Sequence, residues 1–370
     1  MPTLNELRPF KAFPPGRFIT NRLEDRNWTQ KELATVLGIT PIHLSQVMKG
    51  ESPLTYDMAQ RLGATFDTSA QYWSNLYLSF VQWKNEDDLA LSDTEVRSAI
   101  YERMPVKDMV KKKWLKKSAT VKDLEKQALT FWDIKKLDFS FIDEKFTPCL
   151  NRKSEAYNQF NASYAATWFQ KAKQVAKAYK VPAYNKQKLI ALTATLHDAT
   201  VDEAQIPAFI KELNACGVKF FVLPHLEKTY LDGAAFMDGK NPVVVYTARY
   251  KRIDNFWFTV AHEVAHILKH LGPDCPFVLD DLKRGDVDKL EKEANQLAAK
   301  WLKHGEAIAW IERNRGTYIT QAMVVECAEA VGIHPSIVIG AMAHAEIVSF
   351  RNLHLFNSNV LELIPKAYQQ

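Results

Sequence analysis

The stretch that decides the fold is Phe256-Trp-Phe-Thr-Val-Ala-His-Glu-Val-Ala-His-Ile-Leu268, about two thirds of the way along a chain of 370 residues. It is apolar and contains neither Gly nor Pro, so its pattern predicts a helix. Within it lies His262-Glu263-x-x-His266. A four-residue step places the two imidazoles on one helix face, where they can hold one metal ion. Glu263 falls beside that position, where a carboxylate can serve as a general base.

A catalytic zinc site usually has three protein ligands and a water, so one ligand is still missing. His270 continues the same stripe, but it lies about 12 Å along the helix axis from His262, so one ion cannot reach both. The best second source is the helical stretch 290–298, Leu-Glu-Lys-Glu-Ala-Asn-Gln-Leu-Ala. Glu291 and Glu293 flank its apolar stripe at about 80° on either side, and periodicity does not choose between them.

These motifs resemble a known family. Phe-Trp-Phe-Thr-x-x-His-Glu-x-x-His, followed by Glu-x-Glu-Ala-Asn, is similar to the ImmA/IrrE metallopeptidases over roughly residues 200–350. In that family the Glu directly before Ala-Asn is the third zinc ligand. The resemblance therefore implies a zinc endopeptidase, with Mn²⁺ as an alternative metal. Its metal ion would be held by His262, His266 and Glu293, and Glu263 would be the general base. Glu291 is the alternative ligand.

A second set of signals lies in residues 16–66, which read as a run of short helices. Thr29-Gln-Lys-Glu32 has the pattern of a capping box, and Gly38 supplies the turn that ends the helix it begins. Thr40 can cap the next helix, with Pro41 at its first position, where no amide hydrogen is missed. Two short helices joined by a glycine turn predict a helix-turn-helix.

The sequence of this segment resembles the Cro/C1-type family, in particular HigA-like antitoxins. Thr-Gln-Lys-Glu-Leu-Ala, Leu-Gly-Ile-Thr, Met-Ala-x-Arg-Leu and Thr-Ser-x-x-x-Trp all fit within about residues 10–90. The resemblance implies base-reading positions at Pro41, Ile42, His43 and Gln46, and DNA-backbone contacts at Gln30, Thr40 and Lys49. Since Pro41 and Ile42 have no side-chain donors, direct readout would fall to the other two, with apolar contact to thymine methyl groups. A helix-turn-helix used only for dimerisation or packing is the alternative.

The expected fold class is α+β and mainly α. We expect a helix-turn-helix bundle at 1–90, a helical connecting region at 91–200, and a zincin-like domain with a small sheet and C-terminal helices at 201–370. Residues 217–223, 233–236 and 242–247 have the composition of strands. We expect 242–247 to be the edge strand, where an extended peptide could add to the sheet.

Two further patterns have two interpretations each. The run 107–117 holds six lysines and one aspartate, and it could contact DNA phosphates, although a solvated helix face explains it slightly better. In the tail, Thr320-Gln…Val-Gly-Ile-His-Pro335 repeats the order of capping and turn residues found in 29–41. This echo indicates either a second helix-turn-helix or shared capping chemistry, with His334 as a turn residue.

Composition sets the remaining expectations. The chain is 47% hydrophobic and 25% charged with a net charge of +5, which suits a soluble protein of two or three domains and permits DNA as a partner. No run of 18 apolar residues and no signal peptide is present, so we expect a cytoplasmic protein without a membrane contact. Four cysteines lie far apart without a Cys-x-x-Cys pair, which favours reduced thiols.

Together the two family resemblances imply a regulator that couples operator DNA binding to zinc-dependent proteolysis under stress. The expected partners are double-stranded DNA, a second copy in a homodimer, and a protein substrate. That substrate would be a helix-turn-helix repressor (this chain or a partner) or a toxin. One alternative is a non-proteolytic, antitoxin-like repressor whose metal domain is a sensor or a scaffold. Another is a zinc hydrolase of something other than peptides.

Overall fold

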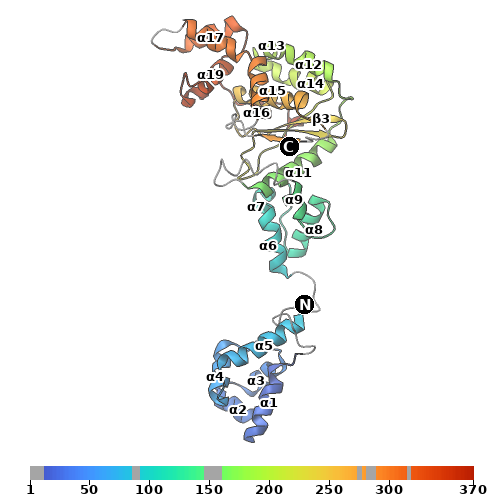
Figure 1. Cartoon of the computed structure of the whole chain (residues 1–370), viewed down its shortest axis with the longest axis vertical. Helices are drawn as coiled ribbons and strands as arrows, with labels where there is room; N and C mark the ends of the chain where they lie inside the picture. The colour runs from blue at the N-terminus through green and yellow to red at the C-terminus, as the bar shows by residue number, and fades with distance from the viewer. Residues whose placement is uncertain (1–11, 86–91, 146–160, 273–276, 281–288, 315–317) are drawn as a thin grey trace. The chain divides into compact units, whose positions relative to one another are not determined.

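A computed structural model describes residues 12–85, 92–145, 161–272, 277–280, 289–314 and 318–370 (Figure 1). The chain divides into two compact units, Met1–Ser92 and Asp93–Gln370. Within the described ranges, no single helix is long and apolar enough to cross a membrane. The pair Gln321–Val331 and Pro335–His344 passes that test only jointly, and it is bent by 107°.

The described part of the first unit, residues 12–85 and 92, is a bundle of five helices. They are α1 (Pro15–Arg26), α2 (Gln30–Leu37), α3 (Pro41–Lys49), α4 (Tyr56–Phe66) and α5 (Ala70–Asn85). The predicted caps are confirmed: Thr29 and Glu32 form a reciprocal capping box, and the Thr40 side chain accepts the His43 amide. Gly38 and Gly50 end α2 and α3 at φ values of 67° and 72°, which favour glycine.

The core of this unit lies between α2 and α3 and the helices that flank them. Leu33, Leu44, Val47 and Trp73 are fully buried, and each buried side chain of this kind contributes about 1.5–3 kcal/mol. Gly16 lets α1 cross α3 closely, because a Cβ there would collide with the Met48 backbone. The opposite side of α3 is left open to solvent.

The second unit is built on a sheet whose described part has four strands. They are β1 (Lys219–Val222), β2 (Gly233–Asp238), β3 (Asn241–Tyr246) and β4 (Phe277–Asp280), in the order β1-β3-β2-β4. The pairing of β1 with β3 is parallel, and the other two pairings are antiparallel. The prediction that 242–247 is an edge strand is wrong, because β1 and β2 pair with its two sides. The strand β4 was not expected from the sequence.

Helices cover both faces of the sheet (Figure 1). Phe220, Val244 and Tyr246 face one core, and Phe221, Val243 and Val245 face the other, as strand alternation requires. The second core also holds buried residues between Val96 and Ala176, so the region expected to connect two domains packs on the sheet instead. Its helices are α6 (Asp93–Arg103), α7 (Val106–Lys111), α8 (Val121–Trp132), α9 (Ser140–Lys145) and α11 (Ala162–Ala178).

The first core is covered by the remaining helices. They are α12 (Lys186–Ala194), α13 (Leu196–Thr200), α14 (Ile206–Ala215), α15 (Ile253–Lys269), α16 (Lys289–Trp301), α17 (His304–Asn314), α18 (Gln321–Val331), α19 (Pro335–His344) and α20 (Val360–Leu363). The repeated pattern in the tail forms two helices, α18 and α19, that are bent by 107° relative to each other, and both interpretations of the pattern include such a pair. His334 caps α19 through its ring nitrogen, which confirms it as a turn residue. However, Ser336 to Ala343 are buried without a break, so α19 is a core helix.

Candidate metal centre and nucleic-acid interface

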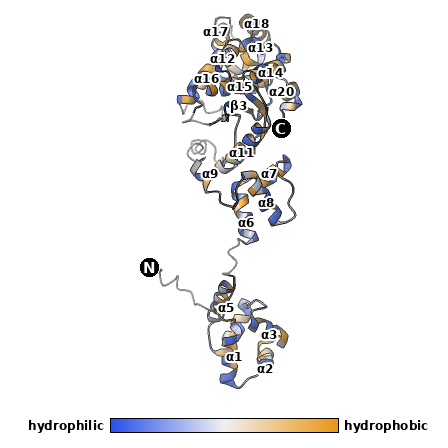
Figure 2. Cartoon of the chain, turned by 90° about the vertical axis from the view of Figure 1, so that its right-hand side faces the viewer, coloured by the Kyte–Doolittle hydropathy of each residue, from blue (hydrophilic) through white to orange (hydrophobic). Residues whose placement is uncertain are grey.

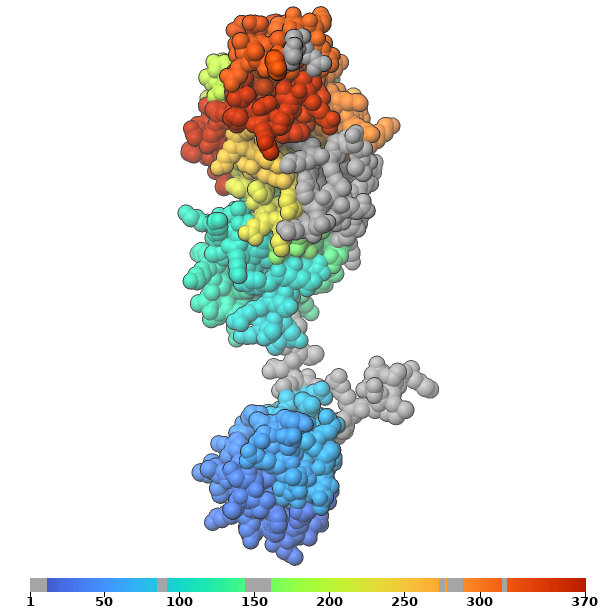
Figure 3. All heavy atoms as spheres, turned by 90° about the vertical axis from the view of Figure 1, so that its left-hand side faces the viewer, coloured from blue at the N-terminus to red at the C-terminus, as the bar shows by residue number. Residues whose placement is uncertain are grey.

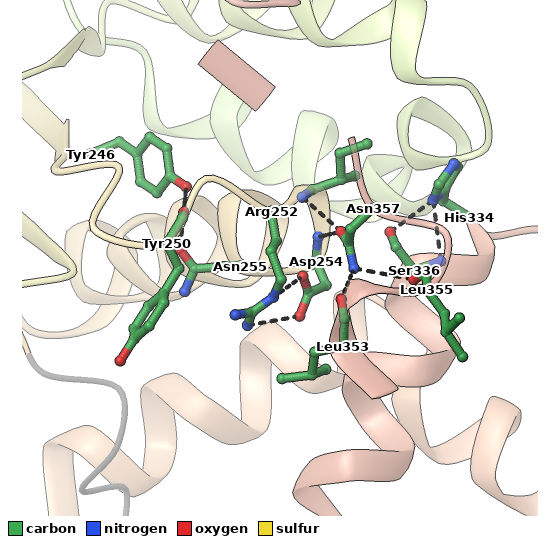
Figure 4. Close-up of polar contacts among 11 residues, drawn as sticks. Tyr246, Tyr250, Arg252, Asp254, Asn255, His334, Ser336, Leu353, Leu355 and Asn357 are labelled. Carbon is green, nitrogen blue, oxygen red and sulfur yellow. Dashed lines mark hydrogen bonds and ion pairs between the residues drawn. The ribbon is translucent and has the colours of Figure 1, made fainter. Parts of the chain in front are cut away.

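The predicted central helix, α15, is held at its start by the C-terminal segment. The Asn357 side-chain oxygen accepts the amides of Ile253 and Asp254, and its nitrogen donates to the Leu353 carbonyl (Figure 4). The Arg252 guanidinium donates two hydrogen bonds to the Asp254 carboxylate, at 2.9 and 3.2 Å. These contacts satisfy helix-end groups that would otherwise lack partners, and they fix the helix relative to the tail.

The middle of α15 packs directly on the sheet. Gly233 of β2 lies against the Glu263 carboxylate and Thr259, and a Cβ at position 233 would collide with Glu263. His262, Glu263 and His266 all have zero exposure. The sequence therefore places the three polar side chains of the motif in a dry site between α15, β2 and α16.

Glu291 of α16 faces the histidine pair. The His262 and His266 Nε2 atoms are 2.8 Å apart, and the Glu291 carboxylate oxygens lie 3.3 Å from the first and 3.6 Å from the second. All the ligand atoms of this trio lie within 4.8 Å of one another. Two donors about 2.0–2.1 Å from a tetrahedral zinc ion would stand about 3.4 Å apart, so the trio has the spacing of a metal site.

Glu293, the ligand that the family resemblance implied, is not brought to this trio. Its carboxylate lies 3.3 Å from His270 Nε2 instead. The reason is helical phase: two residues along α16 turn the side chain by about 200°, and α16 packs with Glu291 toward the histidine pair. The geometry thus supports the alternative that periodicity left open.

Each histidine of the pair has a second partner on its other nitrogen. His262 Nδ1 lies 2.9 Å from Asn295 Oδ1, and His266 Nδ1 lies 2.8 Å from His270 Nδ1. An amide oxygen can only accept, so His262 donates through Nδ1 and its Nε2 carries a lone pair. Likewise His270 can donate to Glu293 and accept from His266. When both Nε2 atoms are deprotonated, two lone pairs and a carboxylate converge, and this donor set fits a divalent cation.

Protons on the two imidazoles stabilise the ionised form of Glu291. Burial tends to raise the pKa of Glu291, but hydrogen bonds and charge attraction from His262 and His266 outweigh it and hold that pKa well below its ordinary value. Burial lowers the pKa of His270, and its hydrogen bond to Glu293 offsets part of that shift. Glu291 is therefore ionised, as a metal ligand must be.

The predicted DNA-contacting residues lie on the open side of the first unit. Ile42 is 74% exposed, Gln46 is exposed one turn further along α3, and His43 is half-buried between them. The other predicted positions are also exposed: Gln30, Thr40, Pro41 and Lys49. Gln46 also accepts a long hydrogen bond of 3.4 Å from the Ser52 hydroxyl. The structure gathers all seven on α2, α3 and the turn that joins them.

The sequence patterns missed the roles of two residues beside the predicted metal site. Asn295 was not singled out, and His270 was considered only as a ligand, although each lies four residues after a member of the trio, the spacing that shares a helix face. Cys216 and Cys327 are free and buried, whereas Cys149 and Cys275 lie outside the described residues.

Fold and site together define a helix-turn-helix regulator joined to a metallopeptidase-like domain. The family of helix-turn-helix domains matches residues 19–73, and the IrrE N-terminal-like domain family matches residues 214–338. The chain is thus a fusion of a Cro/C1-type helix-turn-helix domain with an ImmA/IrrE-like domain, and it is a DNA-binding regulator.

A curated relative supports the assignment of the helix-turn-helix domain. Over 62 residues the chain is 34% identical to the uncharacterized HTH-type transcriptional regulator YddM of Escherichia coli (strain K12). That alignment covers 17% of this chain and 66% of the relative. The chain therefore spans about two thirds of the length of this relative, and the likeness bears on the first unit alone.

Proposed function

We propose that the second unit is a metal-dependent endopeptidase whose ion, zinc or manganese, is held by His262, His266 and Glu291. The observation that carries this proposal is the convergence of two buried imidazoles and one carboxylate, whose ligand atoms lie within 4.8 Å of one another. A divalent ion bound there supplies Lewis-acid polarisation of water and of the scissile carbonyl. Asn295 and His270 orient the two imidazoles through their other nitrogens.

Glu263 is the proposed general base. It follows His262 directly, and its carboxylate is buried against Gly233, outside the donor set. In the reaction its carboxylate takes a proton from the attacking water and returns it to the leaving amine. Because Glu263 is buried, its charge interactions are screened less than they would be in bulk water.

The proposed biological role couples this activity to transcription. The α3 helix reads operator DNA through Gln46 and His43, with Ile42 in contact with thymine methyl groups and Lys49 on the phosphates. The substrate is a helix-turn-helix repressor, either this chain or a partner, cleaved under stress. Cleavage between the two units of a repressor would separate DNA reading from the rest of the chain.

Substitution of the base tests the enzymatic half. The full chain and its Glu263→Gln variant are incubated with Zn²⁺ or Mn²⁺, alone and with proteins encoded by neighbouring genes, and products are identified by gel and mass spectrometry. We expect wild type to cleave and the variant to bind metal equally well without cleaving. Equal cleavage by both proteins would remove Glu263 from this role.

One observation favours a second candidate function. His262, Glu263 and His266 have zero exposure, so in this conformation a polypeptide does not reach them. A repressor whose metal domain is a sensor or scaffold would need no access for a substrate. Metal binding without cleavage of any tested protein, in wild type as well as in the variant, would favour this role.

A further inference from the structure

The chain carries its excess positive charge away from the helix-turn-helix. Residues 1–92 hold nine basic and ten acidic side chains, whereas residues 107–136 hold ten lysines and four acidic residues. The affinity of proteins for DNA comes largely from phosphate neutralisation by Lys and Arg. The reading unit has no surplus charge for this task, and α3 itself has one lysine, Lys49. A second source of phosphate contacts would therefore add to the affinity for DNA.

We infer that a basic patch on the second unit binds the phosphate backbone of duplex DNA. We define this basic patch as Lys111, Lys113, Lys116, Lys117, Lys122 and Lys126, which lie on α7, on α8 and on the connection between them. All six side chains are exposed. None of the six forms an ion pair with an acidic side chain in the described part of the chain. The segment is part of the exposed surface drawn in teal in Figure 3.

The packing of this segment does not require these lysines. Met109 and Leu115 are buried and anchor the run, and the Lys112 ammonium pairs with the buried Asp108 at 3.1 Å. Asp108 also accepts the Glu227 amide, which ties α7 to the loop after β1. The inward half of the run therefore explains the fold, and the exposed lysines are not needed for packing. Figure 2 shows that α7 and α8 carry hydrophilic as well as hydrophobic residues.

The two parts of the basic patch are held together by Gln127 of α8. Its side chain accepts the Lys116 amide at 2.7 Å and donates to the Lys116 carbonyl at 3.2 Å and to the Ser118 hydroxyl at 2.8 Å. The connection is thereby fixed against α8, beside Lys126. Neighbouring like charges without acidic partners raise the local positive potential, which costs free energy in the isolated protein and is recovered on a polyanion.

Duplex DNA is the polyanion that the chain itself indicates. The same chain carries a helix-turn-helix, and contacts to flanking phosphates add affinity without base reading. A patch on a separate unit would strengthen binding to any sequence equally, while α3 would supply the preference for the operator. This inference rests on the proposed operator reading only for the specific duplex in the test below.

The test is the salt dependence of DNA binding. The quadruple variant Lys111→Gln/Lys113→Gln/Lys116→Gln/Lys117→Gln is compared with a matched control, Lys173→Gln/Lys177→Gln/Lys186→Gln/Lys188→Gln. The control removes the same charge from exposed lysines of α11 and α12. The probes are a duplex from upstream of the chain's own gene and a random duplex of equal length.

Each phosphate contact contributes about 0.9 to the slope of log K against log salt. We expect the patch variant to lose about 2 to 4 of that slope, and to lose at least about tenfold in affinity for both duplexes, while the control changes little. Equal behaviour of the two variants would overturn the inference. So would an unchanged DNA slope with lost binding to RNA or to phosphatidylserine vesicles, because the patch would then serve another polyanion.

The two proposals fail separately. If wild type does not prefer the upstream duplex, operator reading by α3 is wrong, but the slope on the random duplex still decides the role of the basic patch. A His43→Ala/Gln46→Ala variant supplies the converse: it should lose the preference for the upstream duplex and keep the salt slope on the random one.

Discussion

Two helix pairs in this chain, α2–α3 and α18–α19, share their turn chemistry and differ in their surroundings. In both, a threonine caps the first helix, a left-handed glycine ends it, and a proline begins the second. Five residues after that proline stands Gln46 in α3 and Gly340 in α19. Gln46 is exposed, whereas Gly340 packs against Asp254. Turn chemistry therefore sets the local shape, and the residues after the proline decide whether the second helix can meet DNA.

The largest expected effect comes from placing a side chain at the buried Gly340 of α19. A Cβ on Gly340 would stand 3.2 Å from the Asp254 side chain, so Gly340→Leu must displace the start of α15. We expect the second unit to lose about 3 kcal/mol of unfolding free energy, measured by denaturant titration. Gly305→Leu is the control, since nothing lies within 4 Å of a Cβ at that position. Equal losses in both variants would show that α19 is not tightly packed at Gly340.

Substitution of the exposed Gln46 should weaken DNA recognition and leave the stability of the first unit unchanged. Gln46→Ala removes a side chain that can reach a base edge, so we expect the preference for operator over random DNA to fall about 10- to 100-fold. The unfolding free energy of the first unit should stay within about 0.5 kcal/mol of wild type. Electrophoretic mobility shifts and denaturant titration measure the two quantities. An unchanged preference would remove Gln46 from the reading surface.

Acidification should destabilise the second unit more than the first. Burial lowers the pKa of His304, beside α19, to about 4, and it lowers the pKa of His344 as well. Since these folded pKa values lie below the ordinary value of 6.5, the unfolded chain binds more protons, and stability falls as pH drops from about 6.5 toward 4. For His304 the lowered pKa corresponds to a loss approaching about 3 kcal/mol from the second unit at pH 4.

The control for this pH dependence is His304→Phe, which keeps a ring stacked on Phe258 and has no proton to bind. It should flatten the pH dependence of unfolding of the second unit. The first unit has one histidine, His43, and should change little over the same range. A pH dependence that is identical in wild type and His304→Phe would assign the loss to other groups.

The smallest expected effect concerns what the two pairs share. Thr29→Ala and Thr320→Ala each remove a hydroxyl that accepts a helix-end amide, from Glu32 and Met323 respectively. Each substitution should cost its own unit about 1 kcal/mol, measured by thermal or denaturant unfolding. A loss in only one unit would show that the two caps are not equivalent.

The sequence predicted the features that depend on local chemistry. Capping at Thr29 and Thr40 and the helix around His262 follow from residues a few positions apart, and the structure has them. The edge position of 242–247 failed because β1 pairs with β3 in parallel, through a long crossover that local patterns do not encode. The choice between Glu291 and Glu293 depends on how α16 packs on α15. The burial of α19 had a signal, because Ser336 to Ala343 has no charged residue and such helices are buried.

The central claim is that Glu291, rather than Glu293, completes the metal site. The most direct measurement is a competitive zinc titration of the full chain against a chromophoric chelator, for wild type, Glu291→Ala and Glu293→Ala. We predict that Glu291→Ala loses at least about 100-fold in affinity, while Glu293→Ala, which frees only His270, loses about tenfold or less. A larger loss in Glu293→Ala than in Glu291→Ala would contradict the account.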